Sequence, residues 1–188
     1  AFTLLCVDDE ANILSSLRRL FRPHGYKVLV AGGGVEGLEM LAGEHVDLII
    51  SDMRMPGMDG ATFLAEARQR YPDTVRLLLT GYADMDSTIA AINSGQIARY
   101  IAKPWNDQDV LLTVREALER QALLREKARL EALALRQNEE LKSLNASLEH
   151  KVEARTSELK AAHEKLKQHF LTSIRVFANL IELREGAS

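Results

Sequence analysis

The sequence predicts an α/β protein with a doubly wound parallel sheet of five strands, followed by a long α-helical coiled coil. Two observations lead to this fold class. Up to about residue 104, short apolar runs alternate with amphipathic stretches, which is the pattern of a parallel sheet covered by helices on both faces. All four prolines and ten of the eleven glycines lie at or before Pro104, so almost nothing in the rest of the chain stops a helix.

Strands are expected at the apolar runs, and helices where apolar residues recur every three or four positions. The expected strands are near 2–7, 26–31, 46–51, 75–80 and 98–102. The expected helices are near 11–21, 35–42, 60–70 and 85–94, and a fifth begins at 106. The first helix places Ile13, Leu17 and Phe21 on one face, and Pro23-His24-Gly25 ends it.

Residues 121–170 are predicted to form a coiled coil that joins two copies of the chain in parallel. The clearest apolar stripe has the three- and four-residue spacing of a coiled-coil seam. It consists of Leu141, Leu144, Leu148, Val152, Leu159, Ala162 and Leu166. Arg155 interrupts it, where the spacing indicates a four-residue stutter that locally unwinds the supercoil. Between Gln121 and Asn138 the position of the seam is ambiguous.

Composition and charge exclude several classes of protein. Cys6 is the only cysteine, so no disulfide forms within the chain, and a reducing compartment fits best. Asp8 interrupts the first apolar run too early for a signal peptide, and no run approaches the roughly 20 apolar residues needed to cross a bilayer. The net charge of −3 gives no electrostatic argument for nucleic acid. We therefore expect a cytoplasmic protein without membrane or nucleic-acid partners.

Polar groups that suit phosphoryl chemistry stand where apolar strands end. They are Asp8, Asp9, Asp52, Thr80 and Lys103. Strand ends of an open α/β sheet meet at one edge, where such proteins bind ligands. An aspartate accepts a phosphoryl group only when a divalent cation offsets the anionic charge, and Mg²⁺ prefers carboxylate oxygens. The three acids would hold Mg²⁺, while Lys103 and Thr80 would contact the phosphoryl oxygens. Each residue alone is typical of an ordinary loop, but five in this order favour a site.

This order of acid pair, acid, hydroxyl and amine, over about residues 1–120, resembles the receiver domain of two-component response regulators. The resemblance implies a flavodoxin-like strand order and a phosphoryl group that Asp52 accepts from a sensor histidine kinase. It also implies that Asp9, Asp52 and the backbone carbonyl of Arg54 bind Mg²⁺ directly, whereas Asp8 acts through water.

The same resemblance assigns roles at the ends of the fourth and fifth strands. Thr80 and Lys103 would stabilise the bound phosphoryl group. The peptide bond between Lys103 and Pro104 would be cis. Tyr100 would act as a switch that turns inward as Thr80 closes on the phosphoryl group.

Arg54 and Tyr82 occupy positions that, in this family, modulate the lifetime of the phosphoryl group. The chain departs from the family here, because Gly81 follows Thr80 where alanine is common. We expect this departure to loosen the loop and to place the aromatic ring of Tyr82 beside the site.

Residues 171–188 are expected to begin an output domain that the sequence does not complete. A wide apolar stripe there has no partner in the chain; it consists of Phe170, Ile174, Phe177, Leu180 and Ile181. Residues 148–159 resemble signalling helices that join input modules to outputs. Residues 172–184 resemble the opening helix of the HD-GYP family of cyclic di-GMP phosphodiesterases, without its metal-binding His/Asp motifs. We expect this chain to hydrolyse nothing itself, although a longer parent would be such an enzyme.

Two other classes of function stay open. One is a structural coiled-coil adaptor whose receiver is not phosphorylated, and the intact acidic cluster argues against it. The other is an enzyme that acts through its own helical tail. The absence of metal-ligand spacing after residue 110 argues against that class.

Overall fold

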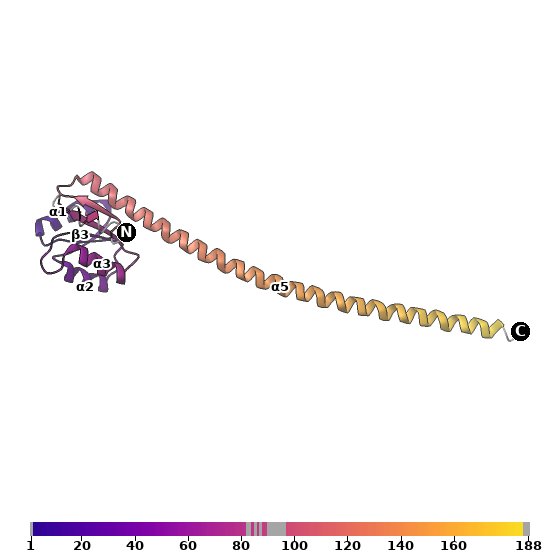
Figure 1. Cartoon of the computed structure of the whole chain (residues 1–188). Coiled ribbons are helices and arrows are strands. Elements are labelled where there is room, and N and C mark those ends of the chain that lie inside the picture. Colours follow the sequence, from indigo (N-terminus) through magenta and orange to yellow (C-terminus); the bar gives the residue numbers. More distant parts are fainter. Residues whose placement is uncertain (1, 82–83, 85, 87, 90–96, 186–188) are drawn as a thin grey trace. The chain divides into compact units, whose positions relative to one another are not determined.

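The computed structural model describes residues 2–81, 84, 86, 88–89 and 97–185, the last four by their backbone alone. The strands are β1 Thr3–Val7, β2 Lys27–Ala31, β3 Leu48–Asp52, β4 Val75–Thr80 and β5 Arg99–Ala102. The helices are α1 Ala11–Phe21, α2 Gly34–Gly43, α3 Gly60–Arg70 and α5 Asp107–Glu185 (Figure 1). The chain divides into two compact units, residues 1–127 and 128–188.

The five strands form one parallel sheet in the order β2-β1-β3-β4-β5. Parallel neighbours need a crossover connection, which α1, α2 and α3 provide between the first four strands. This is the flavodoxin-like strand order, so the predicted fold class is confirmed. The helix expected near 85–94 lies mostly outside the described residues.

The core has two parts because successive side chains of a strand point to opposite faces of the sheet. In β1, Leu5 and Val7 belong to one cluster, while Leu4 and Cys6 belong to the other. The first cluster also contains residues of α2 and α3, namely Leu41, Phe63, Leu64 and Ala67. The second contains residues of α1 and the start of α5, namely Leu17, Phe21, Val110, Val114 and Leu118. Both faces of the sheet are thus covered by helices.

The third strand differs slightly from its predicted range of 46–51. Its ladder begins where Leu48 pairs with Leu4 and Val75. Just before it, the carboxylate of Asp47 accepts a hydrogen bond from the backbone N–H of Thr3 at 2.9 Å. The strand continues through Asp52, which pairs with Leu79. Asp52 is therefore the last residue of the strand, and its backbone is fixed by the sheet.

The first helix ends as predicted at Phe21, and a 3-10 helix, Arg22–His24, follows it. Gly25 closes this turn with φ +82°, a left-handed conformation that glycine adopts without steric cost. Its N–H donates to the carbonyl of Arg22 at 3.2 Å. The turn returns the chain to the sheet as β2.

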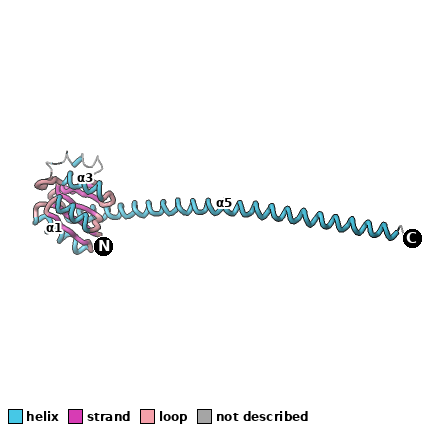
Figure 2. The backbone as a smooth tube through the Cα atoms, turned by 90° about the horizontal axis from the view of Figure 1, so that it is seen from below, coloured by secondary structure: helices cyan, strands magenta, loops and turns pink. Residues whose placement is uncertain are grey.

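The last helix, α5, is continuous over 79 residues (Figure 2). Asn106 caps its start, because the Asn106 side chain accepts a hydrogen bond from the N–H of Gln108 at 2.8 Å. Gln121 and Arg125 donate to the backbone carbonyl of Asp73 at 3.0 and 2.8 Å. The expected long helix is present, and it passes residue 170 without a break.

Every side chain from residue 128 to residue 181 is exposed. These include the predicted seam, in which Leu141, Val152 and Leu159 have exposed fractions of 59, 63 and 72%. Within the described part of the chain, no helix has the combination of length and apolar character that a membrane span requires.

Candidate functional site

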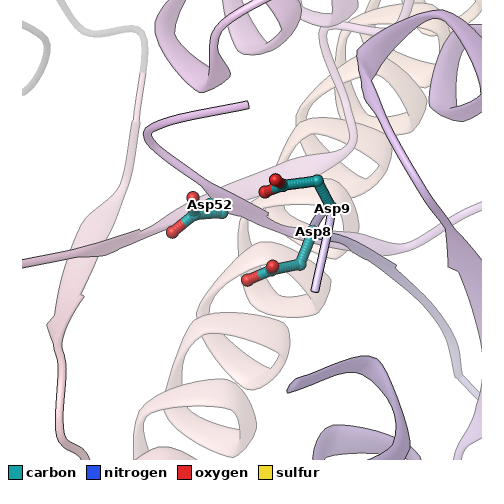
Figure 3. A group of neighbouring side chains, drawn as sticks. All are labelled: Asp8, Asp9 and Asp52. Atoms are coloured by element: carbon teal, nitrogen blue, oxygen red, sulfur yellow. The ribbon is translucent and has the colours of Figure 1, made fainter. Parts of the chain in front are cut away.

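Three carboxylates converge at the carboxyl-terminal edge of the sheet. Asp8 and Asp9 directly follow β1, and Asp52 ends the adjacent strand β3. Because Val7 pairs with Ser51, the two strand ends lie at the same level. One oxygen of each carboxylate lies within 4.8 Å of the others (Figure 3). Asp8 and Asp52 are buried, whereas Asp9 is exposed to solvent.

Lys103 supplies the positive charge of this cluster. Its Nζ lies 2.6 Å from Oδ1 of Asp52 and 3.1 Å from Oδ2 of Asp8. Its backbone N–H donates to the carbonyl of Thr80 at 2.8 Å, which ties it to the end of β4. Its peptide bond to Pro104 is cis, as the resemblance implied. The ammonium group therefore bridges carboxylates from two different strands.

The electrostatics of the cluster follow from burial and from this ammonium group. Burial raises the pKa of Asp8 above its usual range, because a desolvated carboxylate is costly. The N–H of Glu10 and the Lys103 ammonium group oppose that shift. Burial alone would lower the pKa of Lys103, but its hydrogen bonds to Asp52 and Asp8 outweigh burial and raise the pKa. Lys103 is thus held firmly in its cationic form.

The loop after β3 holds the Asp52 carboxylate in place. The backbone N–H of Arg54 donates to Oδ2 of Asp52 at 3.0 Å. Gly60, the first residue of α3, packs so closely that a Cβ there would lie 2.0 Å from the Asp52 carbonyl oxygen. Its N–H also donates to the carbonyl of Met53 at 2.9 Å. Glycine is required at this position because backbone atoms, which cannot move aside, occupy the space.

The Arg54 side chain reaches across the mouth of the site to Asp84. The guanidinium contacts Oδ1 of Asp84 at 2.6 and 2.8 Å. Both residues line a surface depression together with Asp9, Met53, Met55, Pro56 and Asp59. Asp84 could not be predicted from the sequence, because no local pattern indicates that residues 30 positions apart form an ion pair.

Thr80 and Tyr100 lie on neighbouring strands in different environments. Thr80 is buried and donates to the carbonyl of Gly81 at 3.1 Å. Tyr100 is 36% exposed. None of the hydrogen bonds between described residues joins Thr80 to Asp52. Tyr82, for which the resemblance implies an effect on the lifetime of the phosphoryl group, lies outside the described residues.

The donor set of the acidic cluster fits a magnesium ion. Mg²⁺ takes oxygen ligands and is commonly held by one or two carboxylates, with water or phosphate oxygens completing its coordination. Three carboxylates with oxygens within 4.8 Å, one of them exposed, provide such ligands and leave room for others. Nitrogen and sulfur ligands are missing from this group of side chains, which disfavours zinc.

Comparison with known proteins identifies the globular unit. The model of the response regulator receiver domain family matches residues 4–115. The chain belongs to the response regulator receiver domain family. The family that the sequence resembles is therefore confirmed, and the chain contains a receiver domain of two-component systems.

The relatives of this receiver domain include regulators and isolated receiver structures. The hydrogenase transcriptional regulatory protein HoxA of Cupriavidus necator is 40% identical over 121 residues, which are 64% of this chain and 25% of HoxA. The chain thus spans about a quarter of the length of this curated relative. A signal receiver domain of an HD domain-containing protein from Pseudomonas fluorescens Pf-5 is 45% identical, with a TM-score of 0.63 over 66% of this chain and 92% of that one.

A receiver domain from Clostridium thermocellum gives the same structural result. It is 32% identical, with a TM-score of 0.63, and the match covers 66% of this chain and 99% of that chain. Several relatives that share this receiver domain, HoxA among them, are named regulatory proteins. Receiver domains accept phosphoryl groups from sensor histidine kinases, and one matching relative is itself a sensor kinase, CckA of Brucella abortus.

Proposed function

We propose that this receiver domain accepts a phosphoryl group on Asp52 from a sensor histidine kinase, in the presence of Mg²⁺. One observation carries the proposal: the Asp52 carboxylate lies beside Asp8 and Asp9, with Lys103 2.6 Å away. The carboxylates supply ligands for the cation that phosphoryl transfer to an anion requires, and Lys103 supplies a second positive charge. Lys103 pairs with Asp8 and Asp52, so a purely structural ion pair would not account for the third, exposed acid, Asp9.

Asp8, Asp9, Asp52 and the backbone carbonyl of Arg54 would hold the Mg²⁺ ion. When bound, the ion would offset negative charge between Asp52 and the incoming phosphoryl group. The receiver's own residues supply the remaining steps. An oxygen of Asp52 attacks the phosphorus atom of the phosphohistidine; a P–O bond forms as the P–N bond breaks, leaving an acyl phosphate on Asp52.

Lys103 and Thr80 would stabilise the product. The Lys103 ammonium group, which already contacts Asp52, needs only a small movement to bind a phosphoryl oxygen. Thr80 would turn its hydroxyl group away from Gly81 and donate to another phosphoryl oxygen. Tyr100 would then move inward from its half-exposed position, which gives the receiver two arrangements that phosphorylation can bias.

We further propose a receiver over residues 1–120, a parallel homodimeric coiled coil over 121–170, and an output domain that begins at 171–188. The exposed seam side chains support the pairing of two copies, because a single helix leaves them in water. The relative from Pseudomonas fluorescens, a receiver of an HD domain-containing protein, supports an HD-GYP-type output. We place the protein in the cytoplasm, where sensor kinases present their phosphohistidine.

Intact mass after incubation with acetyl phosphate and Mg²⁺ tests the proposed phosphorylation. We expect one phosphoryl group on the wild-type chain, none on Asp52→Asn, and normal labelling of Asp109→Asn, which removes an acid in the first turn of α5. A chelator should abolish labelling. Modification that persists in Asp52→Asn, or in the presence of the chelator, would contradict the site. A folded wild type that takes up no phosphoryl group would favour the adaptor alternative.

Cyclic di-GMP hydrolysis tests the proposed output. We expect no turnover by residues 1–188, and turnover that depends on phosphorylation by a longer protein with an HD-GYP domain. Hydrolysis by residues 1–188 would contradict this division of roles. An inactive longer protein would remove the HD-GYP output and leave the receiver assignment unchanged.

A further inference from the structure

A buried group of oxygen atoms surrounds the hydroxyl of Thr80. Thr88 and Thr80 are both buried, and their Oγ1 atoms lie 3.2 Å apart. Oγ1 of Thr88 also lies 2.8 Å from the backbone carbonyl oxygen of Asp84. Oγ1 of Thr80 lies 3.1 Å from the carbonyl oxygen of Gly81. The two hydroxyls and two carbonyls thus form a continuous row of close oxygen–oxygen contacts.

The number of available protons decides which of these contacts are hydrogen bonds. A threonine hydroxyl has one proton to donate and two lone pairs to accept. The shorter contact of Thr88 is with the Asp84 carbonyl, so its proton goes there and its lone pairs face Thr80. The proton of Thr80 then has two partners, the Gly81 carbonyl and the Thr88 hydroxyl. A hydrogen bond joins the two hydroxyls when this proton goes to Thr88, and none does when it goes to Gly81. The Thr88 hydroxyl thus offers the buried Thr80 proton an acceptor that belongs to the resting arrangement.

The position of Asp84 is itself fixed. Its carboxylate pairs with the Arg54 guanidinium at 2.6 Å, so the carbonyl that accepts from Thr88 belongs to a residue tied to the loop after β3. Thr88 is therefore anchored from one side while it contacts Thr80 on the other. When Thr80 turns away, Thr88 keeps its carbonyl partner, and no buried donor is left unpaired.

We infer that Thr88 is a positioning residue that holds the Thr80 hydroxyl in its resting arrangement and opposes its turn toward a phosphoryl group on Asp52. The inference rests on the proposed phosphorylation of Asp52. A resting state stabilised by one neutral hydrogen bond is favoured by about two- to tenfold. The apparent affinity for a phosphoryl group is reduced by the same factor, because only the turned arrangement binds it fully.

Beryllofluoride, a phosphoryl analogue, tests the inference by equilibrium binding with saturating Mg²⁺. The fluorescence of Trp105, the single tryptophan, and the ¹⁹F resonance of the bound group report binding. Thr88→Val keeps the shape of the side chain and removes the hydroxyl, so it should bind about two- to tenfold more tightly than wild type. Thr88→Ser keeps the hydroxyl and should bind within about twofold of wild type. Thermal unfolding verifies each fold, and Thr88→Ala serves as a second hydroxyl-free variant if Thr88→Val does not fold.

The same substitution in a Thr80→Val background separates positioning from packing. Thr80→Val has no hydroxyl at residue 80 for Thr88 to restrain. Adding Thr88→Val to it should therefore leave the beryllofluoride affinity equal to that of Thr80→Val alone. Equal tightening in both backgrounds, or no tightening in the wild-type background, would overturn the inference alone. A wild-type chain that binds no beryllofluoride would overturn the proposed phosphorylation and this inference with it.

Discussion

The two compact units differ in where the partners of their apolar side chains lie. In residues 1–127, leucines and isoleucines of every strand pack against helices of the same unit, and Leu48, Ile49 and Ile50 are fully buried. In residues 128–181, all side chains are exposed, including leucines at regular spacing. The first unit therefore contains the helices and strands that cover its own apolar side chains. The second carries a regular pattern that no described residue of the same chain covers, and we propose that a second copy covers it.

One physical rule accounts for both units. Apolar periodicity predicts a buried face, and in the globular unit a second element of the chain covers it. In the helical unit the rule predicts burial only upon association, because an isolated helix has one long stripe and nothing to pack on.

Removal of residues 128–188 should have the largest effect. We expect the full chain to sediment as a dimer at micromolar concentration and residues 1–127 to sediment as a folded monomer, since the core clusters lie within the first unit. Sedimentation velocity and circular dichroism measure both. A monomeric full chain, or an unfolded shortened chain, would contradict the contrast between the units.

Gly60→Ala should destabilise the globular unit by roughly 3 kcal/mol, because its Cβ would overlap the Asp52 carbonyl oxygen. Chemical denaturation measures the loss. Gly43→Ala is the matched control: a Cβ there meets nothing within 4 Å, so the free energy of unfolding should change by less than about 1 kcal/mol. Equal effects of the two substitutions would show that the close packing of α3 against Asp52 does not constrain the fold.

Asp8→Asn should stabilise the globular unit by about 1 kcal/mol, or about 4 °C in Tm, while it weakens Mg²⁺ binding. The buried carboxylate costs free energy, and Lys103 keeps Asp52 as its partner after the substitution. Since the pKa of Asp8 is raised on folding, its cost is present at neutral pH and is lost as the pH falls through the folded pKa. The advantage of the variant should therefore shrink upon acidification. An advantage that grows in acid would contradict this origin.

Arg155→Leu should have the smallest effect, a rise of a few degrees in the melting temperature of the dimer. Arg155 interrupts the predicted seam, and within one chain it pairs with Glu158 at 2.9 Å on an exposed surface. Ser157→Leu adds an apolar side chain on the opposite side of the helix and should leave the melting temperature unchanged. If both variants melt alike, Arg155 does not lie in the seam.

Much of the globular unit was predictable because its signals are local. Strand and helix ranges follow from apolar runs and from stop signals such as Pro23-His24-Gly25, and the strand-end acids follow from the parallel sheet. The contact of Arg54 with Asp84, and that of Thr80 with Thr88, could not be predicted. Those contacts depend on how a loop folds over the edge of the sheet, and the spacing of apolar residues in the sequence does not predict that geometry.

The continuity of α5 has a consequence for amide hydrogen exchange. Residues 107–118 of this helix contribute Val110, Val114 and Leu118 to the core, so their amides should exchange only when the globular unit opens, independently of protein concentration. Further along the same helix, the amides beyond residue 128 should exchange faster upon dilution, because in the proposed dimer a second copy protects them. One uninterrupted helix would then show two exchange regimes. The residue beyond which amide exchange depends on protein concentration would mark the boundary between the part of the helix that folds within one copy and the part that is protected only by association.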